Sequence, residues 1–168
     1  MPQPQDWYSL HELKDQLAIS LALTQFAVQV LSNLGLITTR PMPHRPGSRE
    51  VARSVVPWIA CAVGVSPLWG TVDDLDVRLE SLRVAARQGG VADEPEWYRE
   101  QVIAHQLGLS ERNLWPAICI LQKLHMLQRR QNPPGVAAFE IHRTSVPLLC
   151  HAATGRPDAY QQAFGHQR

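Results

Sequence analysis

Residues 6–40 of the chain read DWYSLHELKDQLAISLALTQFAVQVLSNLGLITTR, and residues 96–130 read EWYREQVIAHQLGLSERNLWPAICILQKLHMLQRR. The two stretches align without a gap at an offset of ninety, and the alignment extends to residues 62 and 152. It holds fifteen identities in 57 positions, whereas ordinary composition gives roughly three or four by chance. The sequence therefore predicts one structural module that is used twice, which decides the architecture.

The first copy predicts two helices followed by a β-hairpin. Ser9 and Glu12 have the spacing of a capping box, which predicts a short helix over residues 9–17. After a brief interruption at Ala18-Ile19-Ser20, apolar residues at helical spacing predict a second helix that ends at Gly35. The hairpin is expected to consist of a strand over 36–40, a turn-rich loop over 41–48 and a strand over 49–56.

The second copy predicts the same order of elements. Because proline inside a helix costs stability, its second helix is expected to start near Asn113, with Pro116 in the first turn. In each copy a proline, Pro57 or Pro147, is expected to open one further short apolar helix. The remaining expected elements are a helix at 99–107, a turn at 108–110, a second helix reaching about 126, strands at 127–131 and 138–145, and a loop at 132–135.

The order helix, turn, helix and hairpin resembles winged helix-turn-helix regulators. In that family a serine in the turn is commonly followed, fifteen residues later, by Gly-Leu-Ile, and Ser20 with Gly35-Leu36-Ile37 has this spacing. The second copy keeps Ser110 but has His125-Met126-Leu127 at the later position. In having helices after the hairpin, the layout resembles that of mercury-resistance-type regulators and phage excisionases. The tandem arrangement is similar to kleisin-binding segregation proteins related to segregation-and-condensation protein B.

The expected fold class is mainly α with small β-hairpin wings, as two winged helix-turn-helix modules from an internal duplication joined by a helix. The joining helix is predicted from Thr71, which can cap it, and from acidic residues near its start and arginines near its end. The predicted parts are a first module at 1–70, a connecting helix at 71–90, a second module at 91–154 and a polar, loosely ordered tail at 155–168.

Bulk composition excludes several classes of protein. The net charge of +1 lacks the strongly basic signature of a histone-like protein. Three cysteines without CxxC spacing (Cys61, Cys119 and Cys150) are typical of core residues in a reducing compartment rather than of disulfides or a zinc site. The sequence also contains no apolar run of membrane-spanning length and no signal pattern at its start. We therefore expect a cytoplasmic protein with no membrane partner.

Enzymatic chemistry finds no support in the sequence. It contains no Gly-rich phosphate loop, no nucleophile elbow and no HExxH motif. The cluster of Asp73, Asp74 and Asp76 lies at a predicted helix start, where it suits the helix dipole better than a metal site. We expect no enzyme activity, cofactor, metal or small-molecule substrate.

Double-stranded DNA is the partner that the sequence favours. Glutamines on the outward face of the second helix can pair with adenine, and arginines on the hairpins can neutralise phosphates. The persistence of Arg40/Arg130 and Arg53/Arg143 in both copies also hints at function, because solvated hairpin positions have little structural reason to persist. The predicted DNA-binding residues are Gln25, Gln29, Arg40, Arg45, Arg49, Arg53, Arg112, Lys123, Arg129, Arg130 and Arg143.

A protein-interaction adaptor is the alternative. The outward helix faces carry bulky apolar groups at Phe26, Trp115 and Pro116, which suit docking of a partner or of a second copy. The same side chains can equally complete a core between the two copies. The two outward faces have diverged (Gln25 against Trp115, Gln29 against Cys119), so the copies are expected to make different contacts.

Overall fold

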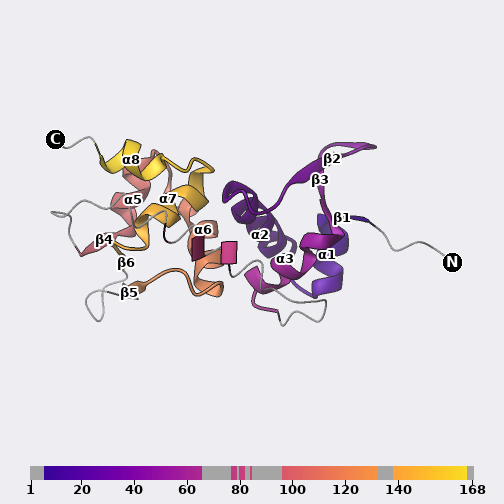
Figure 1. Ribbon diagram of the computed structural model, residues 1–168, viewed down its shortest axis with the longest axis horizontal. Coiled ribbons are helices and arrows are strands. Elements are labelled where there is room, and N and C mark those ends of the chain that lie inside the picture. The colour runs from indigo at the N-terminus through magenta and orange to yellow at the C-terminus, as the bar shows by residue number, and fades with distance from the viewer. Residues whose placement is uncertain are drawn as a thin grey trace.

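The computed structural model describes residues 6–65, five positions between 77 and 84, residues 96–131 and residues 138–165, the side chain of Pro46 excepted. Within these residues the protein is mixed α/β, with seven α-helices and two small three-stranded antiparallel sheets (Figure 1). This agrees with the prediction of a mainly helical fold that carries small hairpins. We refer to residues 6–65 as the N-terminal half and to residues 96–165 as the C-terminal half.

The N-terminal half places a sheet beside three helices. Its third strand is central, because the strand order is β1-β3-β2. The elements are β1 (Trp7–Ser9), α1 (Leu10–Leu17), α2 (Leu21–Asn33), β2 (Thr39–Met42), β3 (Arg45–Ala52), a 3-10 turn (Arg53–Val55) and α3 (Val56–Ala62).

The C-terminal half has the same order of elements and adds one helix at its end. The strand order is β4-β6-β5, and Trp97 lies opposite His142 just as Trp7 lies opposite Ala52, ninety residues earlier. The elements are β4 (Trp97–Arg99), α5 (Glu100–Leu107), α6 (Glu111–Lys123), β5 (Arg129–Gln131), β6 (Phe139–His142), α7 (Val146–Thr154) and α8 (Ala159–Phe164).

Serine side chains begin three of these helices, of which the sequence predicted only the cap at Ser9. The hydroxyl of Ser9 accepts a hydrogen bond from the amide of Glu12 at 3.2 Å, and Ser20 accepts one from Leu23 at 3.1 Å. Ser110 accepts one from Asn113 at 3.2 Å. Each contact satisfies an amide that the first helical turn leaves without a partner. The predicted helix boundaries at 9–17 and 99–107 are confirmed to within one residue.

The strands β1 and β4 were not predicted. Trp7, Tyr8 and Ser9 pair with residues 50–52 of β3, and the second sheet repeats this pairing in β4 and β6. A three-residue strand is too short for an alternating pattern to identify it. Its conformation depends on a partner more than forty positions away, which only the folded chain supplies.

The first hairpin is longer than expected. Only Pro43 and His44 form its turn, whereas the sequence predicted a loop over 41–48 and a strand over 36–40. Leu36 and Ile37 are instead buried in the core. Pro41 is tolerated because β2 is an edge strand, where a missing amide costs no sheet hydrogen bond, and the pairing shifts register after it.

The predicted start of the second helix in the C-terminal half was wrong. This helix, α6, begins at Glu111, and Pro116 lies inside it rather than in its first turn. The Ser110 cap and the burial of Leu114 favour the earlier start. The helix also ends at Lys123, before the expected residue 126, because His125 adopts a left-handed conformation with φ of 58°.

Three further boundaries differ from the predictions. The strand β6 ends at His142, short of the expected residue 145, and β5 begins two residues later than expected. The loop expected at 132–135 lies outside the described residues. The prediction of a loosely ordered tail at 155–168 was wrong for its central part, because α8 buries Ala159 and Tyr160.

The two halves pack against each other through α2 and α6, which cross the middle of the molecule (Figure 1). Val30 on α2 and Ile120 on α6 are fully buried, although neither lies on the face that its helix turns toward its own half. The side-chain amide of Asn33 donates a hydrogen bond to the carbonyl of Ala152 in α7 at 2.9 Å. One continuous apolar core therefore joins both halves.

Most of the predicted connecting helix lies outside the described residues, and so do its aspartate cluster and its apolar stripe. The described positions 77, 78, 80, 81 and 84 are helical. The Arg78 guanidinium lies 5.1 Å from the ring centroid of Trp58 in α3. Across the described part of the chain, no helix has the length and apolar character needed to span a membrane.

Candidate nucleic-acid interface

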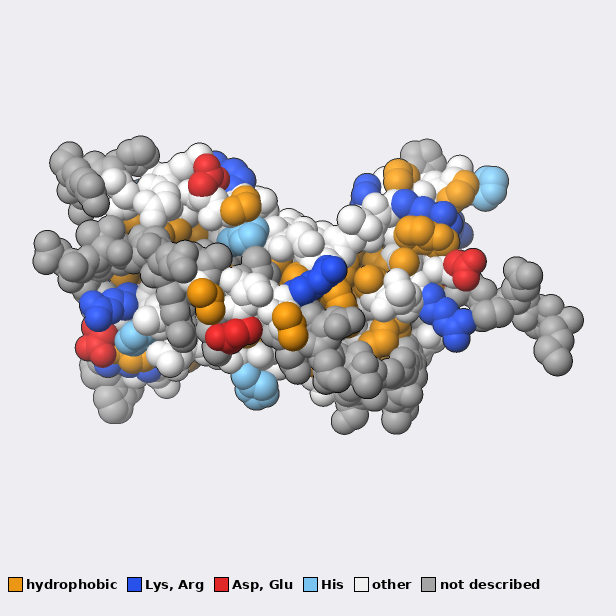
Figure 2. Space-filling view, in the orientation of Figure 1, with side chains coloured by type: hydrophobic (Ala, Val, Ile, Leu, Met, Phe, Trp, Pro, Cys, Tyr) orange, Lys and Arg blue, Asp and Glu red, His pale blue; other side chains and the backbone are white. Residues whose placement is uncertain are grey.

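A groove of about 570 Å³ lies between α2 and the β2–β3 hairpin of the N-terminal half. Four of the predicted DNA-binding residues line it: Gln25 and Gln29 from α2, and Arg45 and Arg49 from β3. All four side chains are exposed. Figure 2 shows the molecule hollowed between its halves, with basic and hydrophobic side chains next to each other on the hairpin. The fold thus brings amide and guanidinium groups from separate elements to one surface.

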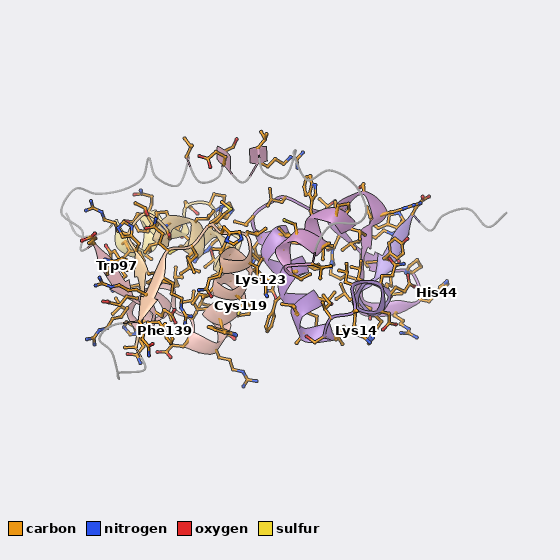
Figure 3. All side chains as sticks on the ribbon, turned by 90° about the horizontal axis from the view of Figure 1, so that it is seen from below. Lys14, His44, Trp97, Cys119, Lys123 and Phe139 are labelled. Atoms are coloured by element: carbon orange, nitrogen blue, oxygen red, sulfur yellow. The ribbon has the colours of Figure 1, made fainter. Side chains whose placement is uncertain are left out.

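Helical spacing explains how α2 contributes to the groove. Thr24, Ala27 and Leu31 turn into the core, so Gln25 and Gln29, one turn apart, must point away from it. The hairpin then stands over this face, with His44 at its far end (Figure 3). The chain therefore presents two amide side chains opposite two cations.

The hairpin holds one of these cations in place. The Arg49 guanidinium donates to the hydroxyl of Thr39 and, at 3.0 Å, to its backbone carbonyl. Both acceptors are neutral, so the positive charge of Arg49 is not cancelled by them. Among the described lining residues none is acidic, which leaves the groove with a net positive charge from Arg45 and Arg49.

Sequence reasoning missed the apolar and small polar residues that line the rest of this groove. Ser9, Leu10 and His11 come from the junction of β1 and α1, and Met42 and Ser48 come from the hairpin. No sequence signal marks these positions, because they meet the α2 face only when the hairpin folds over it. Phe26, which was predicted as a partner contact, is half-buried in the same groove.

Arg40 lies outside the groove and has a structural partner. Its Nε is 2.6 Å from Oε1 of Glu50, and its guanidinium lies 3.8 Å from the ring centroid of Trp7. Glu50 is buried, so the arginine neutralises a carboxylate that water cannot solvate. From the sequence we expected no structural reason for the persistence of this arginine in both copies, and that expectation was wrong.

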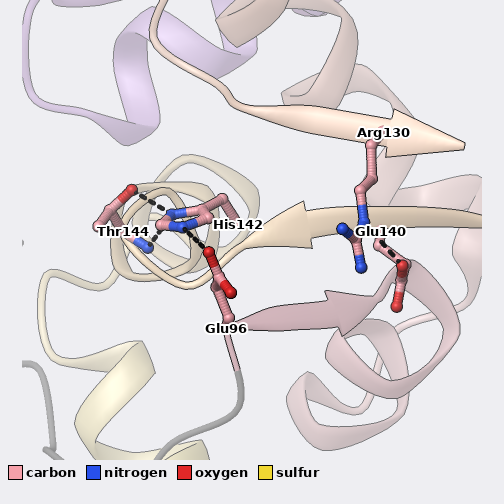
Figure 4. A network of polar contacts seen from close by, with 5 residues as sticks. All are labelled: Glu96, Arg130, Glu140, His142 and Thr144. Atoms are coloured by element: carbon pink, nitrogen blue, oxygen red, sulfur yellow. Dashed lines mark hydrogen bonds and ion pairs between the residues drawn. The ribbon is translucent and has the colours of Figure 1, made fainter. Parts of the chain in front are cut away.

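The C-terminal half repeats this arrangement. Nε of Arg130 is 3.0 Å from Oε1 of buried Glu140 (Figure 4), and its guanidinium lies 4.1 Å from the Trp97 ring. The repetition of Arg40 as Arg130 follows from a shared tryptophan–arginine–glutamate stack. Cations held in this way have little net charge left for a phosphate.

The place that corresponds to the groove is filled by side chains in the C-terminal half. The Arg129 guanidinium lies 3.7 Å from the Phe139 ring centroid and 5.3 Å from that of Trp115, and its Nε is 2.5 Å from Glu100. Ninety residues earlier, the corresponding positions are Thr39, Arg49, Gln25 and Leu10, all of which line the groove. The predicted DNA contact Arg129 is thus only 12% exposed and is already paired.

Cys119, which corresponds to Gln29, lies near this cluster. Partial burial raises the pKa of its thiol, while the nearby Lys123 and Arg129 act in the opposite direction. In α7, burial raises the pKa of the Cys150 thiol to about 12. Both thiols are therefore protonated at neutral pH and are weak nucleophiles.

The remaining predicted residues are dispersed. Arg53 and Arg143 are exposed at the ends of β3 and β6, and their backbone amides donate to Asp6 and Glu96 at 2.8 Å each. Arg112 is exposed near the start of α6.

Two further predicted site residues lie on α6: Lys123, predicted to bind DNA, and Pro116, predicted to contact a partner. Lys123 lies on the side of α6 that faces the N-terminal half (Figure 3), beside Gly64. Pro116 is half-buried, and the neighbouring Trp115 is 43% exposed.

One further polar network lies at the end of the central strand β6 (Figure 4). The hydroxyl of Thr144 is 2.8 Å from Nδ1 of His142, and Nε2 of the same ring is 3.7 Å from Glu96. Because the Thr144 amide also donates to Nδ1, that nitrogen is the acceptor and Nε2 carries the proton in the neutral ring. None of the three residues lines the groove. In the described part of the chain, no group of three or more His, Cys, Asp or Glu side chains has the arrangement of a metal site.

Comparison with known proteins adds no further assignment. No family model, no curated protein and no solved structure matches the chain.

Proposed function

We propose that this chain is a non-enzymatic, double-stranded DNA-binding protein that acts in transcription regulation or in a DNA-processing complex. In this proposal its halves are winged helix-turn-helix modules that arose by duplication, and the N-terminal half alone holds DNA. The observation that carries the proposal is the groove between α2 and the β2–β3 hairpin. It gathers Gln25, Gln29, Arg45 and Arg49 and includes no acidic residue among its described lining.

The groove suits the shape of a duplex. A helix that enters the major groove presents its outward side chains to base edges, and Gln25 and Gln29 are the amides that can pair with adenine. The adjoining sugar-phosphate strand then lies between the helix and the hairpin. There Arg45 and Arg49 meet its phosphates, which position the protein on the duplex.

The C-terminal half is excluded from this role by its own packing. The Arg129 guanidinium lies over both the Trp115 and the Phe139 ring in the place where the N-terminal half has its groove. The cations of the two hairpins are therefore not equally available: Arg129 and Arg130 are paired with glutamates, whereas Arg45 and Arg49 face the groove.

A salt titration of binding to random-sequence duplex DNA tests the proposal. We expect wild-type affinity to fall steeply as salt rises, because bound cations release counterions from the duplex. The double variant Arg45→Ala/Arg49→Ala should weaken binding and lower the slope of log affinity against log salt by about two, since each lost phosphate contact removes about one.

The matched control is Arg99→Ala/Arg143→Ala, which removes the same charge from exposed positions of the C-terminal half. It should leave the slope unchanged to within about one half, because neither residue faces the groove. Equal losses from both double variants would defeat the assignment to the groove. Absence of wild-type binding at low salt would defeat DNA binding altogether.

A protein-interaction adaptor is the second candidate. The apolar part of the groove, with Leu10, Phe26 and Met42, favours it. An adaptor that uses this surface would lose its partner on Phe26→Ala, and any affinity for DNA would be indifferent to Arg45 and Arg49. Trp115→Ala provides the corresponding test for the C-terminal half.

A further inference from the structure

A second cavity, of about 950 Å³, lies in the N-terminal half where β1, α1 and the start of α3 meet. Its apolar lining comes from Trp7 and Tyr8 of β1 and from Val56 and Pro57 of α3, and Gln16 of α1 lies at its side. It shares no described lining residue with the groove beside α2. The cavity is therefore a separate site that the proposed DNA contact does not use.

The C-terminal half shows what covers such a surface. All five of these residues are identical ninety positions later, at Trp97, Tyr98, Gln106, Val146 and Pro147. There the helix α8 packs against both α5 and α7.

Two aromatic side chains of α8, one turn apart, make this contact. The Tyr98 ring meets Phe164 edge to face at 5.5 Å, and Tyr160 stacks on Phe164 at 5.3 Å. As a result Tyr98 is buried, with 8% of its surface exposed, whereas Tyr8 is only half-buried. Edge-to-face contact of this kind stabilises an aromatic pair by more than the burial of its apolar surface alone.

The described residues of the N-terminal half contain no helix that corresponds to α8. The ninety-residue alignment ends at residues 62 and 152, and residues 66–76, which follow α3 as α8 follows α7, lie outside the described residues. The lining is thus kept in both halves, while the aromatic pair that covers it in the C-terminal half has no counterpart among the described residues of the N-terminal half.

We propose that the cavity bounded by Trp7, Tyr8, Val56 and Pro57 docks a helix of a partner protein that carries two aromatic side chains one turn apart. The partner's first aromatic ring occupies the place that Tyr160 takes in the C-terminal half. Its second ring meets Tyr8 as Phe164 meets Tyr98. The protein thereby joins this partner while its α2 face remains free.

A labelled peptide that spans residues 156–165 of this chain is the probe, because it carries the aromatic pair in its native spacing. It is titrated into the full chain, and binding is followed by fluorescence anisotropy. We expect saturable binding that is lost when both Tyr160 and Phe164 of the peptide are replaced by alanine. A peptide that does not bind the wild-type chain overturns the proposal.

Two variants of the full chain locate the site. Gln16→Trp places a large ring at the side of the cavity, while its exposed starting residue contributes little to the core. We expect it to weaken peptide binding by about tenfold or more, the loss that corresponds to about 1.4 kcal/mol. The matched control is Gln106→Trp at the corresponding exposed position of the C-terminal half, which should leave the affinity unchanged.

The remaining outcomes also decide the question. Equal binding to the Gln16→Trp and Gln106→Trp chains overturns the site. Sedimentation equilibrium of the unliganded chain tests whether the aromatic helix comes from a second copy of this chain instead. A dimer that Gln16→Trp abolishes would identify α8 of a second copy as the occupant and overturn docking of a separate partner. A chain that stays monomeric and binds the peptide supports the proposal.

Discussion

At the scale of single residues, the tryptophan–arginine–glutamate stack explains why polar side chains persist in both halves. Glu50 and Glu140 are buried residues of the central strands β3 and β6, and each needs a cation to compensate for lost solvation. Arg40 and Arg130 supply that cation and also cover a tryptophan ring. A position that looks like a binding residue in the sequence thus has a structural task.

Removal of Arg40 tests this role. We expect Arg40→Ala to lower the free energy of unfolding by about 1–3 kcal/mol, because it leaves the Glu50 carboxylate buried without its partner. The measurement is the midpoint of urea unfolding. The double variant Arg40→Ala/Glu50→Gln should recover part of the loss, since the orphaned charge is gone.

The control for this prediction is Arg53→Ala, which removes an exposed arginine from the end of the same strand. Its effect should stay within about 0.5 kcal/mol, as is usual for surface substitutions. A midpoint for Arg40→Ala that matches the control would show that the pair contributes nothing measurable, as many exposed pairs do.

At the scale of elements, α2 and α6 each use two faces. One face packs on the helices of its own half, and a second face packs on the opposite half. Val30 and Ile120 belong to the second face, where their burial holds the halves together. The outward faces that remain carry Gln25 and Gln29 on one helix and Trp115 on the other.

Truncation of the interface residue Ile120 should destabilise the contact between the halves. We expect Ile120→Ala to cost about 2–4 kcal/mol, because it leaves a cavity at a fully buried position. Urea unfolding gives the change in stability. Small-angle scattering should show a larger radius of gyration near the transition, where the halves separate first.

Cys119→Ala is the control for Ile120→Ala, because it truncates the preceding residue of α6 at a half-buried position. It should leave the radius of gyration unchanged. If Ile120→Ala instead lowers the stability without any sign of separation, the two halves unfold as one cooperative unit.

At the scale of the whole molecule, the interface between the halves contains a titratable group. His151 in α7 is half-buried there, and burial lowers its pKa below the ordinary value of 6.5, although a backbone hydrogen bond with Asn33 acts in the opposite direction. Folding therefore favours the neutral ring. The stability that this group contributes is present above the unfolded pKa and is lost as the pH falls through the lower folded pKa.

Acidification should consequently weaken the assembled fold. We expect the melting temperature to fall between about pH 7 and about pH 5, the range in which histidine titrates. His151→Gln should reduce the size of that fall, because the glutamine cannot be protonated. If acidification lowers the melting temperature of the variant and of the wild type by the same amount, the pH dependence arises from other groups.

The two halves also differ in what they leave accessible. The N-terminal half keeps an open groove beside α2 and an open cavity beside β1. The C-terminal half fills the corresponding places with Trp115, Arg129 and Phe139 on one side and with α8 on the other. One order of elements therefore supports two different surfaces, and both proposed binding sites belong to the N-terminal half.

The sequence by itself determined the local features that depend on neighbouring residues. The Ser9 cap, the positions of α1, α2 and α5 and the short helices after Pro57 and Pro147 all follow from spacing within a few turns. The outward direction of Gln25 and Gln29 follows from the same periodicity. These predictions were confirmed because helix caps and apolar faces are local interactions.

Only the tertiary structure decided the features that depend on residues distant in the chain. It pairs β1 with β3, extends the hairpin beyond Pro41, keeps Pro116 inside α6 and folds α8 onto Tyr98. It also separates Arg45 and Arg49, which face the groove, from Arg40, Arg129 and Arg130, which are paired with glutamates. The physical reason is that a charge binds a ligand only if the fold leaves it unpaired, and pairing is set by which side chains the core brings together.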